Sequence, residues 1–284
     1  MRSGAMSPKS EPSSAGSVVD VGVMRGAVCQ GVREIGGLTG LREYDRLVDL
    51  VDKENACSLP GVSVKYGEFL MVLQRAEAAG YVSADKAAFV CDGLTNGFTG
   101  GIDASLLEGQ LFTSNYKSAN ENRSAVTKSI MSRVAAGKTI VLGPYVRANV
   151  RELKARFNSL RKFAMSAVEK NPLYAPGEYR PCSDHTQSGT NEATNMRGLC
   201  HSINAYNEIA WFLKLDYVMA VSDVDGAFPI LPIAPHLWRF FIFSGYASDK
   251  DTVESLMMHL NGDFGTSGWP GTFKIFFVDV VLQM

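Results

Sequence analysis

Two acidic residues follow an apolar run in the second half of the chain. The run YVMAV covers residues 217–221, and Asp223 and Asp225 come next, before Gly-Ala-Phe. An apolar run of this composition is typical of a buried strand. A carboxylate at the mouth of such a strand is costly unless a charged partner lies on it, and a divalent cation is a common partner. The pattern fits a metal ligand, and it also fits solvated turn acids at a strand end.

The stretch that begins with these acids resembles motif A of reverse transcriptases. The closest pattern is the D-L-x-D-A-Y-F-x-I-P-I-x-P of the DIRS-like group of tyrosine-recombinase retrotransposons. The resemblance implies that Asp223 binds catalytic Mg²⁺, that the Val224 carbonyl lies beside the metals, and that Phe228 is the aromatic steric gate. Gly226 stands where the family usually has its second acid, so we expect the metal ligand at Asp223 and not at Asp225.

A second segment, residues 179–191, reads YRPCSDHTQSGTN and resembles the fingers motif R-x-x-x-D-L-S-x-x-G-x-x-N. The resemblance implies that Arg180 binds the incoming triphosphate and that Asp184 braces the fingers strand. Arginine suits this role because its planar fork can hold phosphate oxygens in a bidentate way. His185 and Thr186 replace the family's Leu-Ser, which is a local departure from the pattern.

A third segment, residues 264–273, reads FGTSGWPGTF and resembles motif B, F-G-L-x-x-x-P-x-x-F. The resemblance implies that Phe264 and Gly265 lie against the templating pair and the nascent base. Glycine there would let the backbone approach the nucleotide closely. An ordinary Gly/Pro turn has similar residues, but three motifs in the family's order are more specific than one. A weaker resemblance to the same element covers residues 83–145.

Together the motifs imply template-directed addition of deoxynucleotides to a primer 3′-hydroxyl. The partners would be a nucleic acid template-primer and deoxynucleoside triphosphates, with two Mg²⁺ ions about 3.5–4 Å apart. In the family the remaining carboxylates come from a Y-x-D-D turn beyond motif B, and no such turn precedes Met284. The resemblance is therefore to a reverse transcriptase truncated after motif B, an RNA-directed DNA polymerase fragment expected to be inactive as given. The alternative is a non-catalytic helical nucleic-acid-binding or interaction protein.

Hydrophobic periodicity predicts the elements that position these motifs. Apolar residues recur at helical spacing in residues 41–52, 66–79, 83–98, 123–136 and 147–168. Ser83 is a candidate N-cap for the third of these helices. Apolar runs bounded by turn residues predict strands at residues 217–221 and 239–243.

We therefore expect an α+β protein with three parts. Residues 1–16 have too little apolar content to offset ordering entropy and form a disordered tail. Residues 17–171 form a helical N-terminal region. Residues 172–284 form a partial right-hand polymerase fingers/palm with antiparallel strands.

Charge and composition narrow the partners and the compartment. The net charge of −1 gives no bulk attraction to nucleic acid, so such a partner needs a local basic patch. Bases outnumber acids in one stretch, as Lys138, Arg147, Arg151, Lys154, Arg156, Arg161, Lys162, Lys170 and Arg180 against Glu152, Glu169 and Glu178. That excess could track a nucleic-acid backbone, or it could be a solvated helix face.

The five cysteines show no C-x-x-C pair, which argues against a structural zinc site and a disulfide framework. No signal sequence and no run of about 18 apolar residues is present. We expect an intracellular protein without a membrane partner, with cytoplasm or nucleus left open.

Overall fold

The computed structural model describes residues 37–171, 173, 175–199 and 227–284. These residues all belong to one compact unit, which spans Ile35–Met284. Asp223, Val224 and the expected strand at residues 217–221 lie outside the described residues. The unit is α+β, as the sequence predicted, with helices and strands mixed along the chain.

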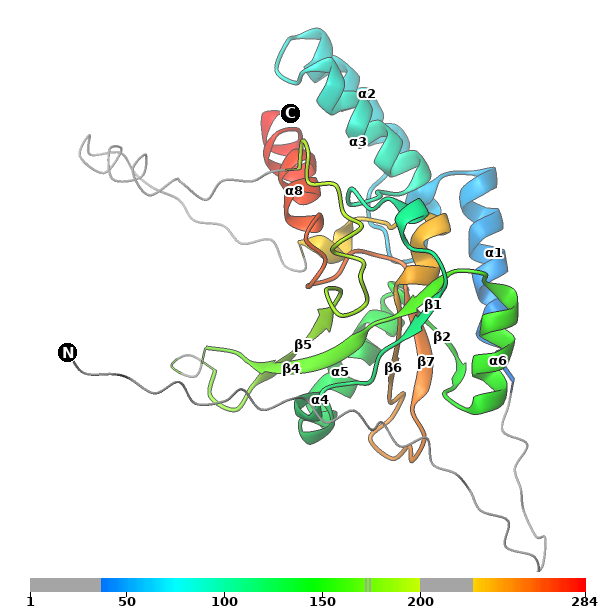
Figure 1. Ribbon diagram of the computed structural model, residues 1–284. Helices are drawn as coiled ribbons and strands as arrows, with labels where there is room; N and C mark the ends of the chain where they lie inside the picture. Colours follow the sequence, from blue (N-terminus) through cyan, green and yellow to red (C-terminus); the bar gives the residue numbers. More distant parts are fainter. Residues whose placement is uncertain (1–36, 172, 174, 200–226) are drawn as a thin grey trace, which may run out of the picture. The chain divides into compact units, whose positions relative to one another are not determined.

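The first described elements are three helices, α1 (Gly40–Lys53), α2 (Tyr66–Ala78) and α3 (Ala84–Asn96) (Figure 1). All three confirm helices predicted from periodicity. Their buried side chains lie on single faces, for example Leu47 and Val51 on α1. Apolar residues spaced three or four apart lie on one side of a helix, which explains why the pattern was informative.

Five further helices lie among or after these three in the described residues up to residue 156. The helix predicted at residues 123–136 is α5 (Arg123–Ala135). The others in this region are η1 (Ala56–Ser58), η2 (Ala104–Leu106), α4 (Lys117–Glu121) and α6 (Arg147–Arg156). The C-terminal part has η3 (Phe228–Ile230), η4 (Pro235–Phe240), α8 (Trp269–Phe273), η5 (Lys274–Val278) and η6 (Val281–Gln283).

A five-stranded sheet forms the centre of the unit, in the order β1-β3-β6-β7-β2. Its strands are β1 (Gln110–Phe112), β2 (Thr139–Pro144), β3 (Leu160–Lys162), β6 (Ile242–Gly245) and β7 (Ser255–His259). The pairs β1·β3 and β3·β6 are parallel, whereas β6·β7 and β2·β7 are antiparallel. The sheet is therefore mixed. Its two strands from residues 172–284, β6 and β7, pair in the expected antiparallel way, and the parallel pairs involve β1 and β3.

The sheet takes strands from both sides of residue 172. β1, β2 and β3 precede that position, and β6 and β7 follow it. The region before residue 172 thus contributes strands as well as helices. Every residue of β6 is buried, including Ser244, so both faces of this strand are covered.

The helix expected at residues 147–168 is wrong beyond Arg156. α6 ends there, Phe157 is extended, and β3 and then β4 (Ala164–Glu169) follow. Residues 160–165 are all buried, so apolar side chains line both sides of the chain. Such a run cannot be told from a buried helix by periodicity, and Asn158 and Ser159 were the breakers that separated the two elements.

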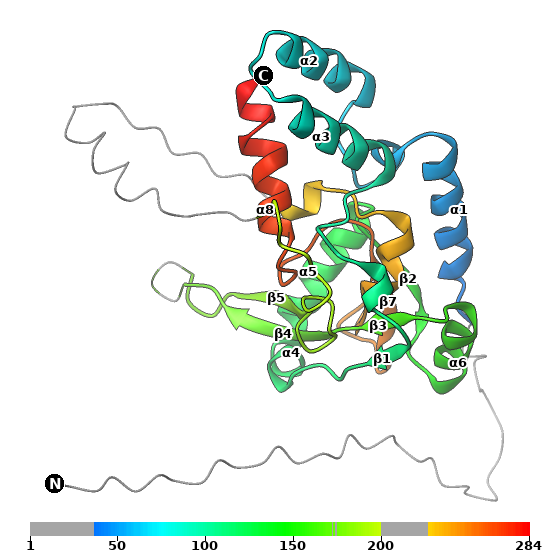
Figure 2. The same cartoon turned by 45° about the horizontal axis from the view of Figure 1, so that its top comes forward.

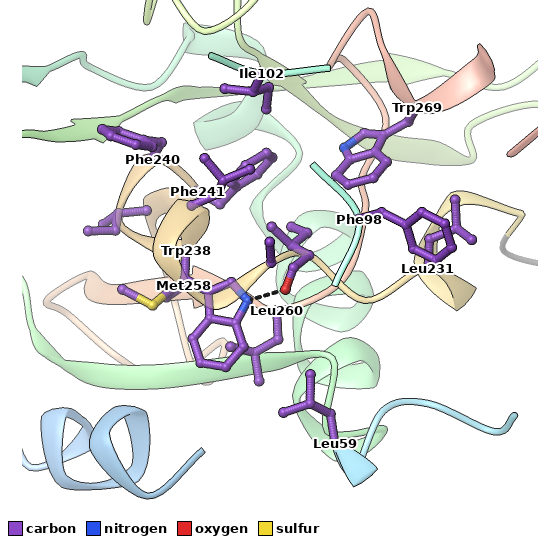
Figure 3. Close-up of a cluster of buried hydrophobic side chains, with 14 of the residues drawn as sticks. Leu59, Phe98, Ile102, Leu231, Trp238, Phe240, Phe241, Met258, Leu260 and Trp269 are labelled. Carbon is purple, nitrogen blue, oxygen red and sulfur yellow. Dashed lines mark hydrogen bonds between the residues drawn. The ribbon is translucent and has the colours of Figure 1, made fainter. Parts of the chain in front are cut away.

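The strand expected at residues 239–243 is displaced toward the C-terminus. The chain first forms η4, with Pro235 at its start, and β6 begins at Ile242. Proline pre-sets the backbone for the first helical turn, and the Trp238 indole N–H donates to the Ile233 carbonyl across it at 2.8 Å. The 3₁₀ turn thereby carries Trp238 into the core, where Phe240, Phe241 and Trp269 are also buried (Figure 3).

A separate hairpin pairs β4 with β5 (Tyr179–Asp184) in antiparallel register. Its strands run side by side away from the five-stranded sheet (Figure 2). α4 contacts β4, and α5 contacts β5. This hairpin carries the expected fingers residues.

Candidate functional site

The fingers-like and motif B-like segments contact each other directly. The Ser183 N–H donates to the Phe264 carbonyl at 3.1 Å. The Asn191 side chain donates to the Gly265 carbonyl at 2.9 Å and accepts from the Ser267 N–H at 2.8 Å. Two segments that are distant in sequence are thus joined through backbone groups.

Gly265 is required at this contact. Its φ is 129°, a conformation that L side chains rarely adopt. A Cβ atom at this position would overlap the Ser183 carbonyl oxygen. The close approach that glycine permits in the structure is to the backbone of β5.

The residue expected as steric gate lies against the same loop. The Phe228 ring is 4.9 Å from the Phe264 ring and 6.1 Å from the Phe273 ring, centroid to centroid. Phe228 is partly buried, whereas 47% of Phe264 is exposed. The described part of the motif A-like segment therefore reaches the motif B-like loop through the aromatic contacts of Phe228, and Asp223 and Val224 lie outside the described residues.

Asp184 ends β5 and ties it to neighbouring segments. Its carboxylate accepts hydrogen bonds from the Tyr116 hydroxyl at 2.5 Å and from the N–H groups of Thr186 and Gln187 at 3.0 and 2.9 Å. Burial raises the pKa of Asp184, but these donors outweigh burial and hold the pKa below its ordinary value. This geometry suits a brace for the strand.

Arg180 is exposed on β5 and lines a cavity of about 730 Å³. One wall is a face of α5, the second is the β4–β5 hairpin, and Pro229 and Phe264 reach it from the C-terminal half. Ligand pockets commonly have volumes of about 300–1,000 Å³. The cavity therefore brings Arg180 and Phe264 to one space of suitable size.

The cavity is basic although the whole chain is slightly acidic. Five bases and two acids line it, an excess of three positive charges against a net charge of −1 for the chain. The bases are Lys128, Arg133, Lys138, Lys170 and Arg180, and the acids are Glu178 and Asp263. A concave surface with one sign of charge concentrates counter-ions, here anions.

Not every base of the stretch from residue 138 to residue 180 is available to a partner. Arg161 is 8% exposed and donates to the carbonyls of Glu108 and Gly109 at 2.7 Å each. Lys162 is 1% exposed and donates to the Thr113 carbonyl at 2.7 Å, and burial lowers its pKa to about 8. These two bases support β3 and the segment beside it.

A buried polar cluster lies at the inner end of the cavity. The His185 Nε2–H donates to the Asp263 carboxylate at 2.8 Å, and the Thr266 hydroxyl donates to the other oxygen at 3.2 Å. Burial raises the pKa of Asp263, but His185 and the other donors hold it well below the ordinary value. The replacement of leucine by His185 was the sequence signal for this pair, but its partner could not be identified from spacing.

Arg133 and His259 complete this inner end. The guanidinium donates to the carbonyls of Asn261 and Gly262 at 3.1 and 3.2 Å, and burial lowers its pKa to about 10. The His259 Nδ1 is hydrogen-bonded to the Thr139 hydroxyl at 2.7 Å. Burial, with help from Arg133, holds the pKa of His259 well below its ordinary value, so the imidazole is neutral.

Comparison with known proteins found no matching family model and no matching curated protein. The site must therefore be interpreted from its own geometry. Within the described ranges, no three or more His, Cys, Asp and Glu side chains gather where they could hold a metal ion. None of the described helices is both long and apolar enough to cross a membrane.

A second cavity, of about 670 Å³, is lined mainly by residues 99–105 and 195–199. None of the site residues expected from sequence lines it. Residue spacing could not place Lys128 or Glu178 at the first cavity, because α5 and the hairpin are brought together only by tertiary packing.

Proposed function

We propose that this chain carries the fingers and the first part of the palm of a reverse-transcriptase-like polymerase, and that its basic cavity receives a deoxynucleoside triphosphate. The observation that carries the proposal is the contact of Asn191 and Ser183 with the loop of Phe264 and Gly265. The resemblance pairs these two segments around one nucleotide, and their hydrogen bonds support that pairing.

The described residues suggest a division of roles. Arg180 neutralises phosphate charge from the hairpin wall, with a planar fork suited to phosphate oxygens. Phe228 packs beside Phe264 and excludes a ribose 2′-hydroxyl by its bulk. The Gly265 backbone lies against Ser183 of β5, next to Phe264.

Asp223 is the residue that would hold Mg²⁺, and it lies outside the described residues. The ion would supply charge neutralisation and orientation of phosphate oxygens. The roles of Arg180 and Phe228 given above are argued without it. A template-primer is the expected macromolecular partner.

The proposal is tested by equilibrium binding of deoxythymidine triphosphate in the presence of Mg²⁺. Arg180→Gln should weaken binding by about tenfold or more, because a hydrogen bond to a charged group contributes about 1.5–3 kcal/mol. Arg151→Gln is the matched control, since Arg151 is exposed on α6 and does not line the cavity. Equal affinity in the Arg180 variant and the control would contradict the proposal.

The Mg²⁺ dependence of triphosphate binding distinguishes the polymerase from the alternative, a non-catalytic helical binding protein. Asp223→Asn should reduce the Mg²⁺-dependent part of the triphosphate affinity and leave the Mg²⁺-free part unchanged. A non-catalytic binding protein would tolerate this substitution without loss of metal or nucleotide affinity. Phe228→Ala should raise the affinity for the ribonucleotide relative to the deoxyribonucleotide.

A further inference from the structure

The cavity has a second basic wall that none of the sequence motifs includes. One face of α5 lines it with Ala125, Lys128, Ser129 and Ser132, which occupy positions i, i+3, i+4 and i+7 of the helix, and Ala136 lines it just beyond the helix end. Small side chains on this face leave the cavity open, and Lys128 is exposed. The only acid that lines the cavity near the surface, among the described residues, is Glu178.

Glu178 lies opposite Lys170 on the hairpin. Its carboxylate accepts from the Lys170 ammonium at 2.8 Å, and its carbonyl accepts from the Lys170 N–H at 2.7 Å. The hydrogen bond and charge of Lys170 lower the pKa of Glu178, and the charge of Lys128 lowers it further. The carboxylate is therefore an anion paired with Lys170 of the hairpin, in a cavity that Lys128 of α5 also lines.

The hairpin register puts this pair beside Arg180. Val168 pairs with Arg180 and Glu169 with Tyr179, so Lys170 and Glu178 continue the ladder. Side chains two residues apart point to the same face of a strand, so Glu178 and Arg180 share a face, as do Val168 and Lys170. Lys170, Glu178 and Arg180 all line the cavity.

We propose that Lys128 and Lys170 form a phosphate subsite next to Arg180, in which the Glu178 carboxylate is an internal counter-ion that an incoming phosphate displaces. Phosphate suits the position because it carries more charge than a carboxylate and has more acceptor oxygens. Lysine binds it as a point charge and needs no fixed geometry. The subsite rests on the proposed function only for the molecule that bears the phosphate.

The exposure of Glu178 makes this counter-ion easy to displace. A carboxylate on the surface can leave its bases at little cost, since exposed ion pairs are weak. Both partners are largely open to solvent, with 49% of the Lys170 side chain and 60% of the Glu178 side chain exposed. Glu178 thus lowers the affinity for anions without closing the cavity.

The first test measures binding of inorganic triphosphate to the full chain by calorimetry. Glu178→Gln should tighten binding about two- to fivefold, and Lys128→Gln should weaken it about two- to fivefold, the range expected for exposed charge pairs. Glu121→Gln is the matched control, because Glu121 pairs with Lys117 at 3.0 Å on α4 and does not line the cavity. Thermal unfolding of each variant checks that the fold is retained.

Unchanged affinity in both the Glu178 and Lys128 variants overturns the subsite, as does equal tightening in Glu178→Gln and Glu121→Gln. The result is separable from the proposed function. Loss of deoxynucleotide affinity in Arg180→Gln with no effect at Lys128 or Glu178 retains the nucleotide site and removes the subsite. Effects of the Lys128 and Glu178 variants on triphosphate binding, with unchanged deoxynucleotide affinity in Arg180→Gln, retain the subsite and remove the polymerase assignment.

A second test identifies the molecule that carries the phosphate. The triphosphate is competed with deoxythymidine triphosphate and, separately, with a single-stranded oligonucleotide. If the oligonucleotide backbone occupies the subsite, Lys128→Gln should reduce the salt dependence of its binding by about 0.7 in the log–log slope. If a nucleotide occupies it, that slope is unchanged and Lys128→Gln weakens nucleotide binding instead. Failure of both ligands to compete overturns the subsite.

Discussion

Asp263 is a buried carboxylate whose ionised form depends on its neighbours. It is 3% exposed, and His185 and Thr266 supply its side-chain hydrogen bonds. An unpaired buried charge is strongly destabilising, so the pair must be kept or removed as a unit. His185 belongs to the fingers-like segment and Asp263 precedes Phe264, so this pair also joins the two segments.

We expect His185→Leu to destabilise the protein by about 3 kcal/mol, because it leaves Asp263 without its imidazole donor. The double variant His185→Leu, Asp263→Asn should recover part of this loss, with a coupling free energy of about 1–3 kcal/mol. Urea denaturation of the two single variants and the double variant measures the coupling. Simple additivity would show that the hydrogen bond does not join the segments energetically.

Gly265→Ala should lower the free energy of unfolding by about 1–3 kcal/mol, the usual cost of a sparsely allowed backbone conformation. The φ of 129° and the Ser183 carbonyl both oppose a Cβ atom. Gly67→Ala is the matched control, since Gly67 is in α2 with open space around it, and alanine should stabilise that helix by about 0.5–1 kcal/mol. Denaturation midpoints that move equally in both variants would disprove the requirement for glycine.

His259 should make stability depend on pH below neutrality. Its pKa in the folded protein lies well below 6.5, so the unfolded chain binds a proton that the folded chain does not. The free energy of unfolding should therefore fall as pH decreases below about 6.5, by at most about 1.4 kcal/mol per pH unit from this group.

The pH effect is checked with His259→Gln, measured by chemical denaturation from pH 7.5 to pH 5. The variant should be less stable at pH 7.5, because it loses the contact with Thr139, and it should show a smaller decline toward pH 5. A decline as steep as that of the unchanged protein would assign the effect to other groups.

At the scale of elements, the sequence predicted helices better than strands. Surface helices such as α1 and α5 bury one face, which leaves a helical period in the sequence. β3 and the start of β4 are buried on both sides and leave none. The burial of Arg161 and Lys162 in β3 could not be expected from the sequence, because buried bases that donate to backbone carbonyls are rare.

The site shows the same division between local and tertiary information. Motif resemblance singled out Arg180, Phe228, Phe264 and Gly265. In the structure Arg180 and Phe264 line one cavity, Phe228 packs against Phe264, and Gly265 follows it in the same loop. Lys128 lies in a helix that spacing predicted well. Its place in the cavity follows from the packing of α5 on β5, which no local pattern encodes.

The different placements of the bases predict different effects on nucleic-acid binding. Lys170→Gln should weaken binding of a single-stranded oligonucleotide about two- to fivefold, because Lys170 is exposed at the cavity. Lys162→Met should leave that affinity unchanged within about twofold, because its ammonium is held by the Thr113 carbonyl. Fluorescence anisotropy at a fixed salt concentration measures both, and a larger effect from Lys162 would contradict the structural role of β3.

At the scale of the whole molecule, the central sheet links the two halves of the chain. β6 pairs with β3, and β7 pairs with β2. Residues 172–284 alone would expose apolar side chains of β6 and β7 that these partners cover. An exposed strand edge with buried-type side chains promotes aggregation.

We therefore expect a polypeptide of residues 172–284 to lack a cooperative unfolding transition, whereas residues 35–284 should unfold at about the same denaturant concentration as the full chain. Circular dichroism during urea titration, with solubility measured in parallel, distinguishes the two. A cooperative transition in residues 172–284 would favour an independent domain that begins near residue 172.

The seam between β5 and the Phe264–Gly265 loop has a mechanical consequence. Three backbone-directed hydrogen bonds and the close approach at Gly265 fasten these two sides of the basic cavity together. We expect the hairpin and the loop to move together. A widening of the cavity then requires a displacement of α5 relative to the hairpin. We expect entry of a bulky ligand to depend on the position of α5, while the tilted rings of Phe228 and Phe264 beside the loop stay in place.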